Sequence, residues 1–499
     1  MSEEIKNVEV QEVQEDISEI LQVRRDKLKN LQDEGRDPFH VTKYERTAWS
    51  EEVKANFETM ENQTVSIAGR IMSKRGMGKA IFADVQDGKG RIQIYVRFND
   101  VGEAAFADFK KVDIGDIVGV TGFVFKTRMG EVSIHAEKVE LLSKSLRPLP
   151  EKFHGLTDLA TRYRQRYVNL IVNPDSRRNF EIRSKFVKYL RNFLDNRGYM
   201  EVETPVLNTL AGGAAARPFI THHNTLDIDM YMRIATELHL KRLIVGGLER
   251  VYEVGRIFRN EGMDTKHNPE FTTVELYQSY ADFNDMMDLF EDLLSGAARD
   301  ILGTYDVEWQ GEKISLAPGF RRMTMAEAVK EYVGVDFMAI DDDAEAVAAA
   351  KAAGVDMDGV EPTWGHSLFE TYDQLVEKHI VQPTFITMHP VDVSPLAKRS
   401  PADPRLTERF ELFICRSEMG NAFSELNDPI DQKQRFQKQV EMRAKGNDET
   451  EMMDEDFINA LEYGMPPTGG LGIGIDRCVM MLTGSDSIRD VILFPTMKP

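Results

Sequence analysis

The sequence predicts an α+β protein in which a small barrel of five strands precedes a larger domain of antiparallel strands and helices. Three patterns predict it. Between residues 64 and 141, apolar and polar residues alternate in five short runs separated by turns, which is typical of a small closed barrel. Two similar runs, at 251–260 and 271–279, flank a polar loop and indicate an antiparallel hairpin. Between the five barrel runs and this hairpin, residues 176–197 have the periodicity of an amphipathic helix.

The composition is that of an ordinary globular protein. The 499 residues are 42% hydrophobic and 29% charged, enough for two or three domains. No run of eighteen apolar residues occurs, so we expect no transmembrane helix and no membrane partner. The first twenty residues hold seven acids and one lysine, unlike a signal peptide, and we expect a cytoplasmic protein. Cys415 and Cys478 stand in no CxxC or Cys/His cluster, so we expect neither disulfides nor a zinc site.

Charge gives a divided answer about nucleic acid. The net charge of −21 argues against a nucleic-acid binder, because neutralising phosphates needs Lys and Arg. Residues 144–191 nevertheless form a basic block, which weakens the argument against nucleic-acid binding.

The element order suggests four segments. Residues 1–60 hold an acidic tail and two short helices, the second with Ser50 as its expected N-cap. Residues 61–143 hold the five strands; from the pattern alone, an oligonucleotide-binding OB-fold and a mere scaffold are equally open. Residues 144–176 are interpreted as a linker and 177–499 as the second domain, whose helix-rich stretch at about 320–364 carries no identifiable chemistry.

The hairpin carries side chains that an apolar core would not use. Residues two apart on a strand share a face, so Arg259 and Glu261 should point one way, and Glu275 and Tyr277 likewise on the returning strand. Unpaired buried charge is costly. The set therefore indicates either a solvated face with surface ion pairs or a site for a ligand with both positive and negative groups.

A second group of polar residues follows at 409–428. Glu411 and Glu418 lie seven apart, with no His or Cys nearby, which suits Mg²⁺, an ion that takes one or two carboxylates plus substrate phosphates. Surface carboxylates on an edge strand are the alternative. Near the C-terminus, the glycine-spaced run at 469–477 leads into an apolar helix; alone, such glycines are weak evidence for a phosphate or nucleotide site.

Together these stretches resemble the three motifs of the class II aminoacyl-tRNA synthetases. Phe258-Arg259-Asn260-Glu261, the loop and Phe271 resemble motif 2, and the glycine run ending at Arg477 resembles motif 3. The helix and strand that close at Pro205 resemble motif 1, the homodimer interface of that class. The resemblance covers about residues 60–499. It implies an OB-fold barrel followed by an antiparallel sheet flanked by helices.

Within the class, stretches 147–155, 267–277 and 418–427 closely resemble the lysyl-tRNA synthetases. That resemblance implies activation of L-lysine with ATP, pyrophosphate release and transfer of lysine to tRNA(Lys). It assigns roles as follows: Arg259 as catalytic residue between amino-acid carboxylate and α-phosphate; Arg259, Glu261, His267, Asn268, Phe271 and Arg477 for ATP; Gly213, Glu237, Arg259, Glu275, Tyr277, Asn421, Phe423 and Glu425 for lysine; Glu411 and Glu418 for Mg²⁺; Arg75, Phe82, Gln93 and Glu131 for the anticodon.

The acidic residues favour a cationic amino acid. A bond from Glu425 to an ε-ammonium would contribute about 1.5–3 kcal/mol, whereas a site for aspartate needs Arg or Lys, and none occurs in 421–427. The first rival is an aspartyl- or asparaginyl-tRNA synthetase, and the acidic pocket argues against it. A relative that lysylates a translation factor is the second, but such relatives lack the barrel. A non-catalytic binding module would be expected to lose Arg259, Glu418 or Arg477.

Overall fold

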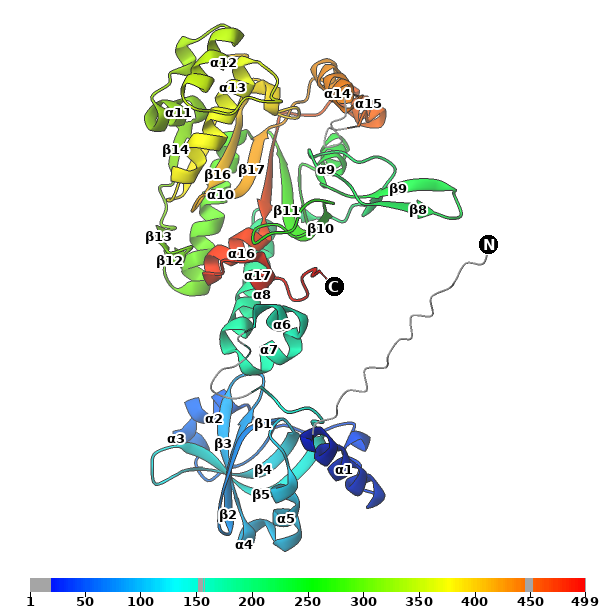
Figure 1. The fold of residues 1–499 in the computed structure, drawn as a ribbon, viewed down its shortest axis with the longest axis vertical. Helices are drawn as coiled ribbons and strands as arrows, with labels where there is room; N and C mark the ends of the chain where they lie inside the picture. The colour runs from blue at the N-terminus through cyan, green and yellow to red at the C-terminus, as the bar shows by residue number, and fades with distance from the viewer. Residues whose placement is uncertain (1–18, 151–155, 157, 445–451, 499) are drawn as a thin grey trace, which may run out of the picture. The chain divides into compact units, whose positions relative to one another are not determined.

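The computed structural model describes residues 19–150, 156, 158–444 and 452–498, which divide into two compact units, 1–156 and 157–499 (Figure 1). The acidic tail predicted for the N-terminus lies outside the described residues, as do residues 151–155 of the stretch 147–155.

The first unit is a closed five-stranded barrel, as predicted. Its strands follow one another in the order β1 (Thr64–Met77), β2 (Ala80–Gln86), β3 (Arg91–Arg97), β5 (Val132–Ser143) and β4 (Ile117–Lys126), and β4 pairs with β1 to close it. Only the β3–β5 pair is parallel. Alternate side chains, such as Ile67, Ile94 and Val120, point inward and are fully buried. Because they fill the interior, a ligand has only the outer face to bind.

Short helices surround the barrel: α1 (Glu19–Asp33), α2 (Ser50–Ala55), α3 (Phe57–Met60), α4 (Phe98–Val101), α5 (Glu103–Lys111) and a 3₁₀ turn at Pro38–His40. The N-cap prediction for Ser50 is wrong, since Trp49 occupies that position. Ser50 is the first helical residue, and its N–H and hydroxyl donate to the carboxylate of Asp87 at 2.7 and 2.8 Å. The Asp87 turn thereby ties α2 to the barrel.

The linker predicted at 144–176 is partly wrong. Helices α6 (Leu159–Arg164) and α7 (Arg166–Val172) lie within it and belong to the second unit. The buried Arg166 guanidinium donates to the carbonyls of Arg489, Ile492 and Leu493 at 2.5, 3.2 and 2.9 Å. Part of the basic block is therefore a structural clamp on the C-terminal segment rather than a free cationic surface.

The second unit is built on an eight-stranded sheet. Its order is β14 (Arg321–Thr324), β15 (Thr384–Thr387), β16 (Arg409–Phe413), β17 (Glu418–Ser424), β18 (Thr468–Gly474), β11 (Glu270–Ser279), β10 (Arg250–Phe258) and β6 (Met200–Glu201). All neighbours are antiparallel except the two edge pairs, β14–β15 and β10–β6. The predicted hairpin is β10–β11. It lies beside the predicted glycine strand, β18.

One face of this sheet is apolar and covered by helices α8 (Pro174–Asp195), α10 (Phe283–Ala297) and α16 (Ile475–Thr483). Leu276 of β11, Leu412 of β16 and Ile473 of β18 are buried in the same core as Phe186 and Phe290 of the helices. Helix α8 confirms the amphipathic helix predicted at 176–197. Since strand side chains alternate between faces, the residues between these apolar ones, Glu275 and Tyr277 among them, point to the opposite face.

Smaller elements complete the unit. The sheet β7 (Leu207–Asn208), β9 (Ile228–Met232) and β8 (Ile220–His223) ends in a hairpin that projects from the rest of the second unit in Figure 1. The other elements are α9 (Glu237–Val245), a π turn (Ala298–Leu302), β12 (Asp306–Trp309), β13 (Glu312–Ser315), α14 (Pro429–Ala444), α15 (Glu455–Glu462) and α17 (Ile488–Val491).

The helix-rich stretch predicted at about 320–364 is longer than expected. It starts with strand β14 and contains α11 (Met325–Val333), α12 (Asp343–Ala352) and α13 (Trp364–Thr371), and single-turn helices continue it to His379. Trp364, Leu368 and Phe337 give it a core of its own. In the part of the chain that the structure describes, no helix is both long and apolar enough to cross a membrane.

Candidate active site

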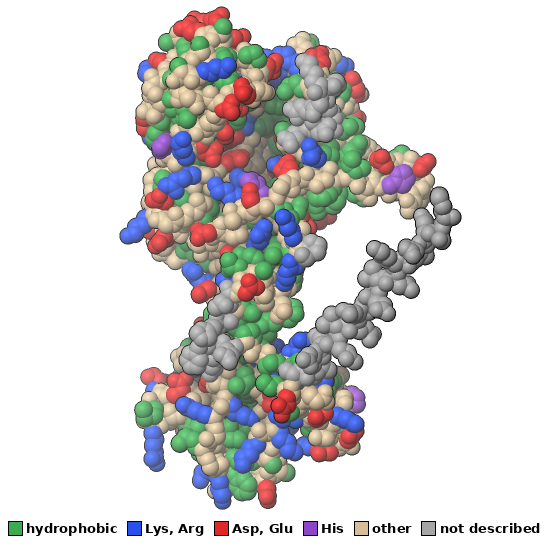
Figure 2. All heavy atoms as spheres, viewed as in Figure 1, with side chains coloured by type: hydrophobic (Ala, Val, Ile, Leu, Met, Phe, Trp, Pro, Cys, Tyr) green, Lys and Arg blue, Asp and Glu red, His purple; other side chains and the backbone are tan. Residues whose placement is uncertain are grey.

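One pocket of the second unit, about 500 Å³ in volume, brings together all the residues that the sequence assigned to ATP, lysine or metal. It is lined by Gly213, Glu237, Arg259, Glu261, His267, Asn268, Phe271, Glu275, Tyr277, Glu411, Glu418, Asn421, Phe423, Glu425 and Arg477. Figure 2 shows the second unit hollowed at its centre, with acidic and basic side chains gathered around the hollow. The solvated-face alternative for the hairpin is therefore wrong, because its charges face a cavity.

Three carboxylates define one end of the pocket. Glu237 starts α9, Glu275 lies on β11 and Glu425 directly follows β17. The N–H of Thr236 donates to Glu275 at 3.2 Å. Burial, followed by the nearby charge of Glu237, raises the pKa of Glu275 to about 7. Burial also raises the pKa of Tyr277 well above its usual value, so its phenol stays protonated and can donate.

Two glycines leave room for these carboxylates. A Cβ at Gly470 would overlap Glu425 Oε1 and would lie 2.6 Å from the Tyr277 ring. Gly213 has φ +85°, and its Cβ would lie 3.1 Å from Ala235 and 3.3 Å from Glu237. The sequence suggested that the glycines let a nucleotide lie against the strand. At position 470 the glycine also leaves space for the carboxylate of Glu425.

Sequence reasoning missed a cation at this end, Lys241. Its side chain has no exposed surface; its ammonium lies 2.5 Å from Glu237 Oε1 and also forms an ion pair with Glu425. The search for Arg or Lys in 421–427 could not find it, because α9 brings it from another part of the chain. The available signal was spacing: Glu237 and Lys241 are four apart on one helix face.

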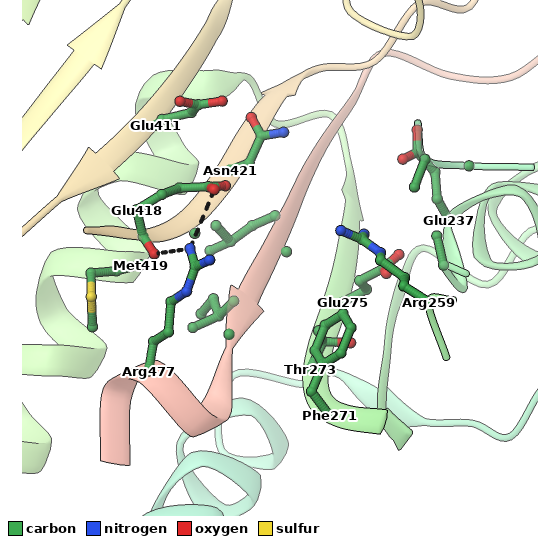
Figure 3. Close-up of a pocket in the computed structure, with 18 of the residues that line it drawn as sticks. Glu237, Arg259, Phe271, Thr273, Glu275, Glu411, Glu418, Met419, Asn421 and Arg477 are labelled. Carbon is green, nitrogen blue, oxygen red and sulfur yellow. Dashed lines mark hydrogen bonds and ion pairs between the residues drawn. The ribbon is translucent and has the colours of Figure 1, made fainter. Parts of the chain in front are cut away.

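The two predicted metal ligands lie on neighbouring strands, with Asn421 opposite Glu411 in the register (Figure 3). A second missed residue, Arg409, donates to Glu411 at 2.6 Å and to Asn421 Oδ1 at 3.1 Å. It stands two residues before Glu411 on the same strand face, which was the signal for it. Within the described ranges, no three His, Cys, Asp or Glu side chains gather to hold a metal alone. Two carboxylates in a cleft suit an ion that takes its other ligands from a substrate.

The other end of the pocket is more open. Arg259 and Arg477 reach into it from opposite sides, Arg259 beside Phe271 and Arg477 from the start of α16 (Figure 3). The Arg259 guanidinium lies 5.3 Å from the Phe271 ring, and its only hydrogen bonds to the described residues are two long ones, 3.4 and 3.5 Å, to the carbonyl of Ile234. Burial lowers its pKa. Because its hydrogen bonds to Ile234 are long, the N–H donors of Arg259 remain available to a ligand.

The polar loop of the hairpin supplies the remaining residues of this end. Arg259 and Glu261 were expected on the strand, but β10 ends at Phe258 because Asn260 turns away to donate its N–H to Arg217. His267 bonds Asp264 at 2.9 Å and lies 3.4 Å from Arg477. The Asn268 amide donates to the Glu270 carbonyl at 2.6 Å, so one of its donors is engaged within the loop.

In the first unit, the four predicted anticodon residues lie around one outer face of the barrel. Arg75 pairs with Phe82 across β1 and β2, its guanidinium 5.5 Å from the ring. Gln93 on β3 accepts from Ser133 at 3.2 Å, and Glu131 before β5 pairs with Lys54 at 3.1 Å.

Phe82 is one end of a row of rings that the sequence did not reveal. Tyr95 lies 4.7 Å from Phe82 and 5.1 Å from His135, which stacks on Phe123 at 4.6 Å. These rings come from β2, β3, β5 and β4, which adjoin only in the closed barrel. The sequence therefore showed one stacking ring where the fold builds a platform.

Comparisons with known proteins agree with both units. Residues 158–498 match the family model described as tRNA synthetases class II (D, K and N), and residues 65–142 match the OB-fold nucleic acid binding domain. A protein named lysine–tRNA ligase from Pelotomaculum thermopropionicum is 59% identical over 488 residues, 97% of this chain and 96% of that protein. Lysine–tRNA ligases of Thermoanaerobacter sp. X514 and Bacillus subtilis are 58% and 55% identical, each over 97% of this chain and 97% and 98% of their own. The chain belongs to the class II tRNA synthetases of the D, K and N group.

Proposed function

We propose that this protein is a lysine–tRNA ligase, which activates L-lysine with ATP, releases pyrophosphate and transfers lysine to the 3′ end of tRNA(Lys). The observation that carries the proposal is the acidic end of the pocket, where Glu237, Glu275 and Glu425 converge. The names of the full-length relatives support the same substrate.

At the amino-acid end, Glu237 and Glu275 would hold the α-ammonium, and Glu425 the ε-ammonium. Glu425 Oε1 is buried and has no hydrogen-bond partner among the described residues, which suits a carboxylate that awaits a cation. Phe423 and Tyr277 would enclose the aliphatic stem. Aspartate fits poorly, because the cation that it would require, Lys241, is already paired with two carboxylates.

At the nucleotide end, adenine would lie between Phe271 and Arg477, with Glu261 and Asn268 at its edge and His267 near the phosphates. Arg259 stands between the two ends, where its planar fork can bind both the lysine carboxylate and the α-phosphate. Glu411 and Glu418 would hold Mg²⁺, which would neutralise phosphate charge. Asn421 and Glu411 are held in place for this by Arg409.

The chemistry needs alignment and charge neutralisation more than proton transfer. The lysine carboxylate oxygen attacks the α-phosphorus, and the bond to the pyrophosphate oxygen breaks. Arg259 would hold the attacking carboxylate against the phosphate and stabilise the negative charge that builds on the phosphate oxygens. In the second step, the terminal ribose hydroxyl of tRNA attacks the adenylate carbonyl, and AMP leaves.

The barrel would read the anticodon, with Phe82 stacking on a base and Arg75, Gln93 and Glu131 bonding base edges. We expect Phe82→Ala to weaken the apparent affinity for tRNA by about 1–3 kcal/mol and to leave adenylate formation intact. Phe39→Ala is a matched control, since Phe39 is an exposed ring away from that face. Equal loss of tRNA charging and adenylate formation would contradict a separate anticodon site.

A homodimer through motif 1 is supported by apolar side chains around β6 and β7. Met200 on β6 and Leu207 on β7 are 53% and 44% exposed, and a partner subunit would cover them. Sedimentation equilibrium should give twice the chain mass, and Leu207→Asp should lower it. A monomeric wild-type protein would contradict this interface. Because the reaction serves translation, we place the enzyme in the cytoplasm.

The deciding experiment is ATP–pyrophosphate exchange with each of the twenty amino acids, without tRNA. Exchange with lysine alone is expected. Exchange with aspartate or asparagine would overturn the substrate assignment, and a requirement for a protein acceptor in place of tRNA would favour the relative that lysylates a translation factor.

A further inference from the structure

Lys241 is a fully buried ammonium that the proposed reaction does not use. It lies between Glu237 and Glu425, and the rings of Phe423 and Phe457 stand 5.4 and 5.9 Å from its nitrogen. A buried ammonium is costly unless it is paired. A methionine or leucine would fill this site more cheaply, so the presence of a charge needs an explanation.

The two carboxylates share this cation in a particular way. Glu237 faces it with Oε1 and Glu425 with Oε2. Glu425 Oε1 is left on the pocket side, buried above Gly470 and without a hydrogen bond among the described residues. Lys241 thus contacts one oxygen of each carboxylate, and Glu425 Oε1, on the side of Gly470, is the oxygen that can face a ligand.

The charges of this end also balance with lysine. When all of them are ionised, Glu237, Glu275 and Glu425 against Lys241 and Arg259 give one net negative charge. Lysine, with two ammonium groups and one carboxylate, carries one net positive charge. Aspartate would add a negative charge to a buried site that is already negative, which a low-dielectric pocket disfavours strongly.

We propose that Lys241 is a positioning and specificity residue, a bridge of fixed length that keeps Glu237 and Glu425 at the spacing of the two ammonium groups of lysine. The inference rests on the proposed function and deepens it. It predicts that Lys241 sets the length of side chain that the enzyme accepts, although it need not touch the substrate.

The ionisation of Glu425 depends on this bridge. Glu425 is faced by Lys241 and Glu237 from α9 and by Glu275 and Tyr277 from β11, with Arg259 beyond Glu275. Burial raises the pKa of Glu425, and Lys241 is the main influence that opposes the rise. Burial alone would lower the pKa of Lys241, but Glu237 and Glu425 raise it above its usual value, so the ammonium stays charged. Without Lys241, the pKa of Glu425 would rise further, so a smaller share of Glu425 would be charged at a given pH and able to bind a cation.

The test is ATP–pyrophosphate exchange by the full-length Lys241→Met variant with lysine, ornithine and norleucine, from pH 6.5 to 9. We expect the KM for lysine to rise about tenfold or more at pH 7, the KM for ATP to stay unchanged, and the preference for lysine over norleucine to fall. The defect should shrink as pH rises, because Glu425 then ionises without its bridge. Arg242→Met is the matched control, since the neighbouring Arg242 pairs with Asp454 and Asp456 outside this pocket.

Lys241→Arg keeps the charge and lengthens the bridge, so it should change the ratio of ornithine to lysine use even if the methionine variant fails to fold. An unchanged ratio in the arginine variant, or a loss in the methionine variant that is the same at every pH and for every amino acid, would overturn the proposal. If wild-type enzyme fails to exchange with lysine, the proposed function itself fails. If it exchanges and both variants behave like wild type, only the role of Lys241 fails.

Discussion

The two ends of the pocket differ in how far they are withdrawn from water. At the amino-acid end, the side chains of Lys241 and Glu425 are 0% and 1% exposed, and each charge has a partner inside the protein. At the nucleotide end, the side chains of His267 and Glu418 are 51% and 41% exposed. A charge in a dry site discriminates between ligands far more strongly than one in water. The buried end therefore suits the selective binding proposed for lysine, and the exposed end suits the entry of ATP and the release of pyrophosphate.

Arg259 joins the two ends, so its loss should have the largest effect. We expect Arg259→Gln to lower the exchange rate by about 10²–10³-fold, because the variant loses the group that holds carboxylate and phosphate together. Arg256→Gln is the control, since Arg256 lies on β10 three residues before Arg259 but is exposed and pairs with Glu270. Similar losses in both variants would mean that the hairpin, not the guanidinium at position 259, limits the reaction.

The dry end should be selective for lysine alone. Glu425→Gln removes the charge that faces the ε-ammonium, worth about 1.5–3 kcal/mol, so the KM for lysine should rise roughly ten- to hundredfold. The KM for ATP should hardly change. Glu455→Gln, at an exposed carboxylate of α15, controls for loss of charge in general. Unchanged lysine use would remove Glu425 from the pocket and erase the contrast between the ends.

The dry end should also be sensitive to pH. Burial raises the pKa of Glu275 to about 7, so this carboxylate is charged above pH 7 and neutral below it. The ratio kcat/KM for lysine should therefore fall as pH decreases through 7, by about tenfold per pH unit. Glu275→Gln should be weaker throughout and should lack this acidic limb. A limb of the same midpoint in the variant would assign it to another group.

The open end should show the smallest effect. His267 is exposed, and its contacts with Asp264 and Arg477 are worth at most about 1 kcal/mol each. We expect His267→Ala to raise the KM for ATP about fivefold or less and to leave the KM for lysine unchanged. A change confined to lysine would reverse the assignment of the two ends.

Much of the fold follows from local pattern. The alternation in 64–141 predicted the barrel strands, and the runs at 251–260 and 271–279 predicted the hairpin, because strand periodicity is a local signal. Residues 159–172 were misassigned as linker because their place in the second unit depends on contacts that are distant in sequence. The anchor of that segment, Arg166, bonds carbonyls more than three hundred residues away, and no local pattern reveals such contacts.

The sequence predicted the residues that line the pocket more fully than the residues that hold those side chains in place. The residues of motifs 2 and 3 were recognised, and the structure gathers them into one pocket with the residues predicted for lysine and metal. Lys241 and Arg409 were missed because each acts on side chains already chosen rather than on the ligand. Their importance appears only when α9 is set against β17, and when β16 is paired with β17. The aromatic row of the barrel was missed likewise, since its rings come from four strands.

Gly470 has a consequence for resistance to inhibitors. The strand β18 would lie against the nucleotide in the proposed site, yet any side chain at position 470 would collide with Glu425, the carboxylate proposed to bind lysine. A substitution that blocked a nucleotide-like drug at this spot would also disable amino-acid selection. We expect compounds that press against Gly470 to meet few viable escape mutants, because one position serves both substrates.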